Sequence, residues 1–115
     1  RKADLVRTVQ GALFTDPCEE IFNQHHDVFR SALVGIGPSG SQRPVIVIEP
    51  VPGRFPATAG EAKRFTEELL RLGSATPLTA GIATVLFHKS FPVDVRHNVK
   101  ISRDKLAHWA AEQSR

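Results

Sequence analysis

The sequence predicts a small α+β domain in which an N-terminal hairpin and a three-stranded mixed sheet pack with helices. Two short strand-like segments flank a Gln-Gly turn at the start of the chain, at residues 4–9 and 11–14. Three apolar runs of strand length follow, at residues 28–35, 45–48 and 82–88. Segments with helical spacing separate or follow these runs, and such a mixture is typical of α+β domains. The 115 residues, 41% of them hydrophobic, suit one domain with one core.

The first helix is expected to begin at the Asp-Pro-Cys-Glu motif of residues 16–19. Aspartate can cap a first turn, proline fits the first helical position, and the glutamate can reach back to the cap. Ile21 and Phe22 share a face with Cys18, which we interpret as a small core residue. The helix should end near residues 23–26.

The second helix has the strongest local pattern. Residues 58–61 read Thr-Ala-Gly-Glu, a capping box. Apolar residues follow at helical spacing: Ala62, Phe65, Leu69 and Leu72. Gly73 is expected to end the helix as a C-cap. Because this helix joins the strands at 45–48 and 82–88, those strands should be parallel if adjacent, with a right-handed crossover.

A polar, turn-rich loop at residues 89–99 precedes the last helix. Ser102 can cap that helix, in which Leu106, Trp109 and Ala110 share a face. Residues 1–115 thus form a single domain with three parts: a hinge and hairpin at 1–14, an α-β-β-α-β core at 15–90, and a loop with a terminal helix at 91–115. The chain contains no methionine, so we expect it to be a piece of a longer protein.

Composition and charge narrow the function classes. The net charge is only +3 with both signs interspersed, which gives little support to nucleic-acid binding. No apolar run is long enough to predict a membrane span. Cys18 is the single cysteine, so a reducing cytoplasm is the simplest setting. No ligand-type spacing accompanies the adjacent His25 and His26, and we expect no metal site.

Lys100, between the polar loop and the last helix, is the leading candidate for chemistry. Lysine carries a compact charge on a flexible stem, which can stabilise the anionic transition states of phosphoryl or adenylyl transfer. The alternative is a solvated lysine beside a helix start. Asp94 can pair with Arg96 to support the loop, and His97 can act as a general base, or all three simply form local hydrogen bonds.

Arg103 lies in the first turn of the last helix, where the helix dipole disfavours a cation. It either has a partner elsewhere in the chain or is a plain surface arginine.

The two ends of the chain resemble motifs of the adenylate-forming enzymes, which include acyl-CoA synthetases, peptide-synthetase adenylation domains and luciferases. The matching residues at the start are Arg1, Asp4, Val6, Arg7, Gly11, Pro17 and Glu19. Those at the end are Pro92, Lys100, Ile101, Arg103 and Leu106, with Val99 where the family usually has glycine. The segments 29–35, 43–49 and 91–100 resemble the olefin-biosynthesis branch, whose members are β-lactone synthetases.

The resemblance implies the C-terminal domain of a ligase that activates a carboxylic acid with ATP and Mg²⁺ and releases pyrophosphate. Most of that active site would lie in a large N-terminal domain absent from this chain, so the isolated domain should be inactive. Lys100 would contact the reacting carboxylate, and Ala3 and Asp4 would form the hinge. Arg1 would face the nucleotide, and Gly11 would face a thiol substrate such as coenzyme A.

The second step remains open at this level. The branch resemblance implies a long-chain, possibly β-hydroxy, acid that closes to a β-lactone, whereas an acyl-CoA synthetase would form a thioester. A non-catalytic α+β interaction or RNA-binding module is the rival of another class, and it would need exposed sheet aromatics or a strongly basic face. A scaffold domain of an inactive ligase homologue is a further alternative.

Overall fold

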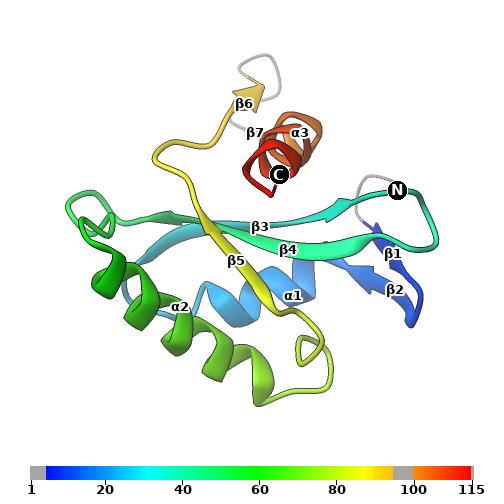
Figure 1. The fold of residues 1–115 in the computed structure, drawn as a ribbon, viewed down its shortest axis with the longest axis horizontal. Helices are drawn as coiled ribbons and strands as arrows, with labels where there is room; N and C mark the ends of the chain where they lie inside the picture. The colour runs from blue at the N-terminus through cyan, green and yellow to red at the C-terminus, as the bar shows by residue number, and fades with distance from the viewer. Residues whose placement is uncertain (1–4, 95–99, 115) are drawn as a thin grey trace.

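A three-stranded mixed sheet forms the middle of the molecule in the computed structural model, which describes residues 5–94 and 100–114 (Figure 1). Strand β3 (Val28–Ile36) pairs antiparallel with β4 (Arg43–Pro50), and β4 pairs parallel with β5 (Thr84–Phe87). β4 is therefore the central strand, and it is almost wholly buried. The predicted sheet and its parallel, helix-linked pair are confirmed.

Helices cover both faces of this sheet (Figure 1). On one face lie α1 (Thr15–Phe22) and α2 (Ala59–Ser74), and on the other lies α3 (Arg103–Gln113). Each face has its own buried cluster. The first cluster joins α1, α2 and the sheet through residues that include Cys18, Phe22, Leu33, Ile46, Ile48, Phe65 and Leu69. The second joins α3 to the sheet through Ala32, Val34, Val45, Val47, Phe91, Leu106 and Ala110. None of the described helices is both long enough and apolar enough to cross a membrane.

Two short hairpins complete the fold. β1 (Leu5–Thr8) pairs with β2 (Gly11–Phe14), and β6 (Val93–Asp94) pairs with β7 (Lys100–Ile101), both antiparallel. The first hairpin is tied to the β3–β4 turn, because the Arg7 carbonyl accepts from Gln42 N (2.9 Å) while Arg7 N donates to Gln42 Oε1 (2.8 Å). The predicted N-terminal hairpin is thus confirmed, and it is fixed to the sheet.

Helix α1 begins differently from the sequence prediction. It starts at Thr15 with Phe14 in the N-cap position and no side-chain cap bond, so the predicted Asp16 cap is wrong. Asp16 instead lies in the first turn, where a carboxylate favours the helix dipole. The predicted end is correct, with Asn23 as the C-cap.

Helix α2 keeps its predicted start and extends past its predicted end. Thr58 Oγ1 accepts from Glu61 N (3.1 Å), and Glu61 Oε1 accepts from Ala57 N (3.0 Å), as a capping box requires. The helix continues to Ser74, so Gly73 is not its C-cap. Gly73 instead allows close packing, since a Cβ there would lie 3.0 Å from the Phe22 ring.

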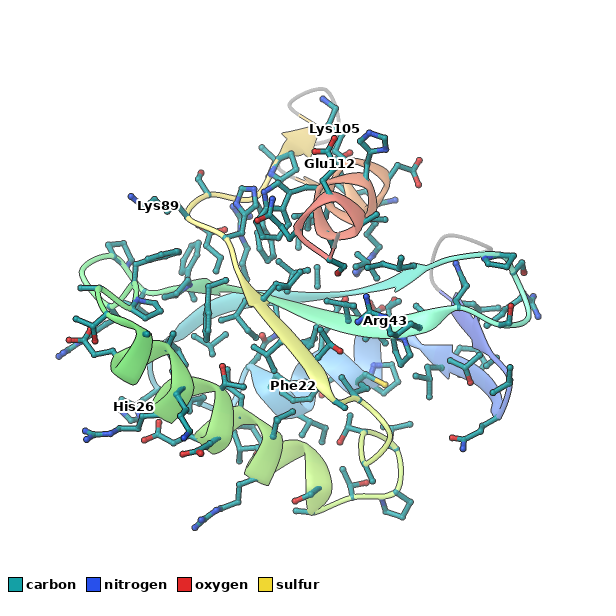
Figure 2. The ribbon with its side chains drawn as sticks, viewed as in Figure 1. Phe22, His26, Arg43, Lys89, Lys105 and Glu112 are labelled. Atoms are coloured by element: carbon teal, nitrogen blue, oxygen red, sulfur yellow. The ribbon has the colours of Figure 1, made fainter. Side chains whose placement is uncertain are left out.

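Phe22 itself lies between α1 and α2 beneath the sheet, fully buried (Figure 2). At α3, Ser102 is the N-cap residue as expected, but its side chain makes no cap bond. Leu106 and Ala110 are buried and Trp109 packs against them, which confirms the predicted apolar face.

Burial of Leu69 on the sheet-facing side of α2 should dominate the stability of the first cluster. Leu69 is fully buried, so Leu69→Ala should lower the free energy of unfolding by about 2–5 kcal/mol, from lost burial and the remaining cavity. Lys63→Ala, at an exposed position of the same helix, should change it by less than about 0.5 kcal/mol. Urea denaturation followed by circular dichroism measures both. Equal effects would contradict this packing.

Candidate active site

Lys100 lies in strand β7, in register opposite Asp94 of β6. Lys100 is exposed, and the strand β7 that carries it lies beside α3 (Figure 1). The sequence predicted only a loop leading to this lysine, and the structure instead places it in a short antiparallel ladder. The ammonium group can therefore move in solvent while the backbone beneath it is held.

The first strand of this ladder is anchored at its base through Phe91, a buried residue two positions before β6. Phe91 N donates to Glu49 Oε1 (3.1 Å), and Arg30 Nε donates to the same oxygen (2.6 Å). The Arg30 guanidinium carbon also lies 5.3 Å from the Phe91 ring centroid. Ser102 N donates to the Pro92 carbonyl (2.9 Å), which closes the base of the ladder. The buried Glu49 carboxylate thus fixes where β6 begins.

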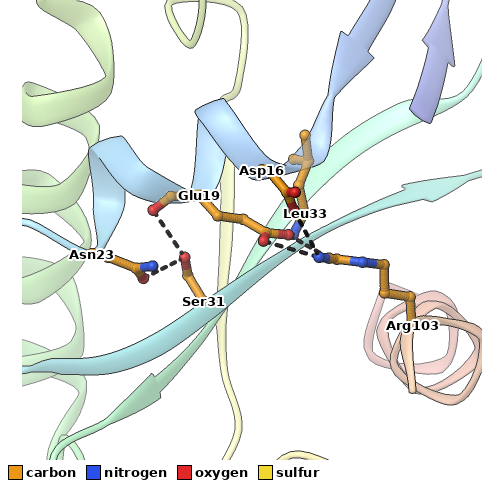
Figure 3. A network of polar contacts seen from close by, with 6 residues as sticks. All are labelled: Asp16, Glu19, Asn23, Ser31, Leu33 and Arg103. Atoms are coloured by element: carbon orange, nitrogen blue, oxygen red, sulfur yellow. Dashed lines mark hydrogen bonds and ion pairs between the residues drawn. The ribbon is translucent and has the colours of Figure 1, made fainter. Parts of the chain in front are cut away.

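The second strand is anchored at the same base through Arg103, the first residue of α3 (Figure 3). Its guanidinium forms a two-point ion pair with Glu19: Nη2 lies 3.0 Å from Oε1, and Nη1 contacts Oε2. Glu19 Oε2 also accepts from Leu33 N (2.7 Å), and an Asp16 oxygen lies 3.7 Å from Arg103 Nη2. A forked arginine matches a carboxylate in this geometry, and the paired charges offset their loss of water. Arg103 therefore has a partner in the chain, as one of the two sequence interpretations required.

The polar network continues along the edge of β3. Ser31 Oγ lies 2.7 Å from Asn23 Oδ1 and 3.3 Å from the Glu19 carbonyl oxygen (Figure 3). These contacts tie the end of α1 to the same strand that receives the Glu19 carboxylate. Helix α1, strand β3 and helix α3 are thus joined by one network of polar contacts.

His88 packs beside the first anchor. Its ring lies edge-on to Trp109 (4.6 Å between centroids) and to Phe91 (5.9 Å), and its Nδ1 accepts from Ser90 N (3.0 Å). Burial lowers the pKa of His88 below its ordinary value of 6.5, although the negative charge of Glu49 opposes the shift. The neutral ring is therefore the form that suits this packing.

Several predicted site residues lie outside the described part of the chain: Arg1, Ala3, Asp4, Arg96 and His97. Only the backbone of Asp94 is described. The predicted hinge, the nucleotide contact and the loop support by Asp94, Arg96 and His97 therefore stay predictions.

Gly11 opens strand β2 with φ of +126°, a value that glycine adopts readily. It lines a surface pocket together with Val9 of the hairpin turn and Pro77 and Leu78 beyond α2. Val9 is 78% exposed, so this side of the hairpin presents an apolar surface. The predicted thiol-facing role of Gly11 stays a prediction.

His25 and Cys18 have structural rather than catalytic surroundings. His25 Nε2 lies 2.7 Å from Glu68 Oε1, its Nδ1 accepts from Asp27 N (3.1 Å), and its ring stacks on His26. Among residues 5–94 and 100–114, no group of three or more histidine, cysteine or acidic side chains could hold a metal ion. Cys18 is fully buried, and burial, followed by the charge of Glu19, raises the pKa of its thiol. Its predicted core role is confirmed.

Sequence reasoning missed the two acids on which these anchors depend. Glu19 was interpreted as part of a capping motif, yet it follows Cys18 and precedes Phe22 on the buried face of α1. Glu49 directly follows an apolar run and received no role. A charged residue on an otherwise apolar face is the signal that could have identified both, since buried charges are nearly always paired.

Comparison with curated proteins finds two relatives, and no protein-family model matches the chain. An olefin β-lactone synthetase of Xanthomonas campestris is 51% identical over 114 residues, and one of Stenotrophomonas maltophilia is 43% identical over 115 residues. Each alignment covers 98% of this chain but only 20% of the relative. The chain thus spans about one fifth of the length of the curated relatives it matches.

Solved structures with the same fold include enzymes that are far more distant in sequence. The amide bond synthetase McbA of Marinactinospora thermotolerans matches with a TM-score of 0.70 at 20% identity, over 92% of this chain and 20% of that one. An acyl-CoA synthetase of Brucella canis matches with a TM-score of 0.75 at 20% identity, over 100% of this chain and 20% of that one. These likenesses establish the fold of a domain found in such ligases.

Acid should destabilise the domain partly through His88. Because its pKa is lower in the folded state, the unfolded chain takes up this proton first as the pH falls through about 6.5, and stability is lost. The His88→Gln variant lacks this contribution. Its free energy of unfolding should therefore fall less steeply than that of the wild type as the pH is lowered from about 7.5 to about 5. Urea denaturation across this range measures both slopes, and parallel slopes would contradict the assignment.

Proposed function

We propose that the chain is the C-terminal lid of an adenylate-forming, acid-activating ligase, because it is similar to the olefin β-lactone synthetases and shares its fold with amide bond and acyl-CoA synthetases. The reaction joins a carboxylic acid to the AMP part of ATP and releases pyrophosphate. The observation that carries the proposal is the exposed Lys100, held on a ladder whose two strands are both anchored in the domain. A larger domain, together with this lid, makes up the proposed enzyme.

Lys100 acts in the first step. The carboxylate oxygen attacks the α-phosphorus, the bond to the pyrophosphate oxygen breaks, and negative charge gathers on the phosphoryl oxygens. An ammonium group placed there offsets that charge, and it does so most strongly where water is excluded. An exposed side chain on a lid can enter such a site when the lid closes and leave it when the lid opens.

ATP and Mg²⁺ belong mainly to the larger domain in this proposal. The described residues of the lid offer no cluster of acids or histidines for a metal ion, whereas Lys100 can face an anionic substrate directly. Arg1 is assigned to the nucleotide, and Ala3 and Asp4 are assigned to the hinge about which the lid turns, on the strength of the motif resemblance.

The second step divides into two candidates. In lactone formation, the β-hydroxyl oxygen of the substrate attacks its own activated carbonyl carbon, AMP leaves, and the hydroxyl proton is lost. The names of the two curated relatives favour this route, with a long-chain β-hydroxy acid as the substrate. In thioester formation, the thiol sulfur of coenzyme A attacks the activated carbonyl carbon instead and AMP leaves, and the pocket beside Gly11, lined by both polar and apolar residues, would face the thiol. Acyl-CoA synthetases among the solved structures of this fold support this alternative.

The rival interaction module finds less support. Helices cover both faces of the β3–β4–β5 sheet, so most of that sheet is closed to stacking RNA bases.

Lys100→Ala should slow acid-dependent pyrophosphate release by the complete ligase about 100- to 1,000-fold, since removal of one transition-state contact typically costs about 2.7–4 kcal/mol. Lys105→Ala is the matched control, because Lys105 is an exposed lysine of neighbouring α3 (Figure 2). It should leave the rate within about twofold. Pyrophosphate release near the wild-type rate in Lys100→Ala would remove Lys100 from the mechanism.

Incubation of the complete ligase with a long-chain β-hydroxy acid and ATP should yield the β-lactone with or without coenzyme A. Mass spectrometry of the extracted products separates the lactone from an acyl-CoA thioester. An acyl-CoA product without any lactone would refute the lactone assignment and leave the first step intact.

A further inference from the structure

We propose that Glu19 and Glu49 are positioning residues that hold the two strands of the Lys100 ladder at its base for acid activation, an inference that rests on the proposed function of Lys100. Neither carboxylate needs to touch substrate. Each acts through the backbone segment that it fixes.

The two acids share one design. Both are buried, with 7% of Glu19 and 8% of Glu49 exposed. Each accepts one backbone N–H, from Leu33 N at 2.7 Å or from Phe91 N at 3.1 Å, and each pairs with one arginine. A carboxylate that loses its water requires such partners, so it sits in one defined place rather than in several.

The two acids hold both strands of the ladder at its base. Glu49, on the central strand β4, holds Phe91, two residues before β6. Glu19, on α1, holds Arg103, the first residue of α3 and two residues after β7. Along the chain Lys100 lies between these two anchored residues, and the Ser102 N to Pro92 carbonyl bond joins the two strands at the base.

The chemistry needs such an arrangement because the lysine cannot be fixed by burial. An exposed ammonium on a flexible stem can be aimed only through the backbone that carries it. A misplacement of about 1 Å at a reacting group can cost about 100-fold in rate. Loosening either strand of the ladder should therefore lower the turnover rate, while the substrate-binding surfaces of the larger domain stay unchanged.

The test makes Glu19→Gln and Glu49→Gln separately in the complete ligase, once with Lys100 present and once in combination with Lys100→Ala. Glutamine keeps the size and one acceptor oxygen but removes the charge that holds the arginine. Acid-dependent pyrophosphate release gives kcat and KM, and thermal unfolding shows that each variant is folded at the assay temperature. Glu68→Gln is the control, since Glu68 lies on α2, away from the ladder, and pairs with His25.

With Lys100 present, each variant should lower kcat about 10- to 100-fold and leave the KM for the acid within about twofold. With Lys100→Ala, the same substitutions should cause no further loss, because no lysine remains to be positioned. Glu68→Gln should match the wild type. If a glutamine variant is unfolded, Arg103→Lys or Arg30→Lys replaces it, because lysine keeps the charge but not the guanidinium fork.

Unchanged kcat in the folded variants would overturn the inference, and so would losses that persist in full in the Lys100→Ala background. Either result leaves the proposed function standing as long as Lys100→Ala alone is slow. A near-normal rate in Lys100→Ala alone would instead reject the proposed function itself.

Discussion

The ion pair between Glu19 and Arg103 is the contact on which the arrangement of this domain depends. Strand β3 is an edge strand, and the N–H of Leu33 points away from its neighbour β4 toward that edge. The Glu19 carboxylate from α1 accepts this N–H, and Arg103 reaches the same carboxylate from α3 on the other face. An unpaired edge donor is thereby satisfied, and helices on opposite faces of the sheet are joined around its rim. Removal of either partner would deprive a largely buried charge of this counter-charge, which is among the costlier changes a domain can suffer.

The two faces of the sheet have different tasks. On one face, α1 and α2 bury large apolar side chains against the sheet. On the other, a smaller cluster that includes Phe91 and Leu106 supports α3 and the Lys100 ladder, and a second acid–arginine pair, Glu49 with Arg30, stands at its margin. Apolar burial does not by itself fix direction, since it is roughly proportional to area alone. Charged hydrogen bonds are directional, so they suit the side of the molecule where a backbone has to be aimed.

Local patterns predicted most of the fold but little of the site's support. Apolar periodicity located the three core strands and all three helices, and the helix between β4 and β5 correctly predicted a parallel pair. The errors concern choices that local chemistry leaves open. Asp16 can cap a helix, yet α1 starts at Thr15, and Gly73 can end a helix, yet it admits the Phe22 ring. Arg103 and Glu19 are 84 residues apart, so no window of sequence shows that they meet. Lys100 itself stood out through motif resemblance, since its spacing alone equally fits a solvated lysine.

In the proposed mechanism, the exposed Lys100 and the two buried acids have complementary roles. Burial of the ammonium would fix it but would also disfavour its charge and keep it from a substrate held by another domain. Full freedom would preserve the charge but spread it over many positions. The structure separates the two requirements, because Lys100 remains in solvent while Glu19 and Glu49 hold the chain on either side of it. The demand for precision is thus met by residues that never need to meet the substrate. The proposal therefore makes these acids as important to the reaction as the lysine, although their local sequence shows only a charged residue on an otherwise apolar face.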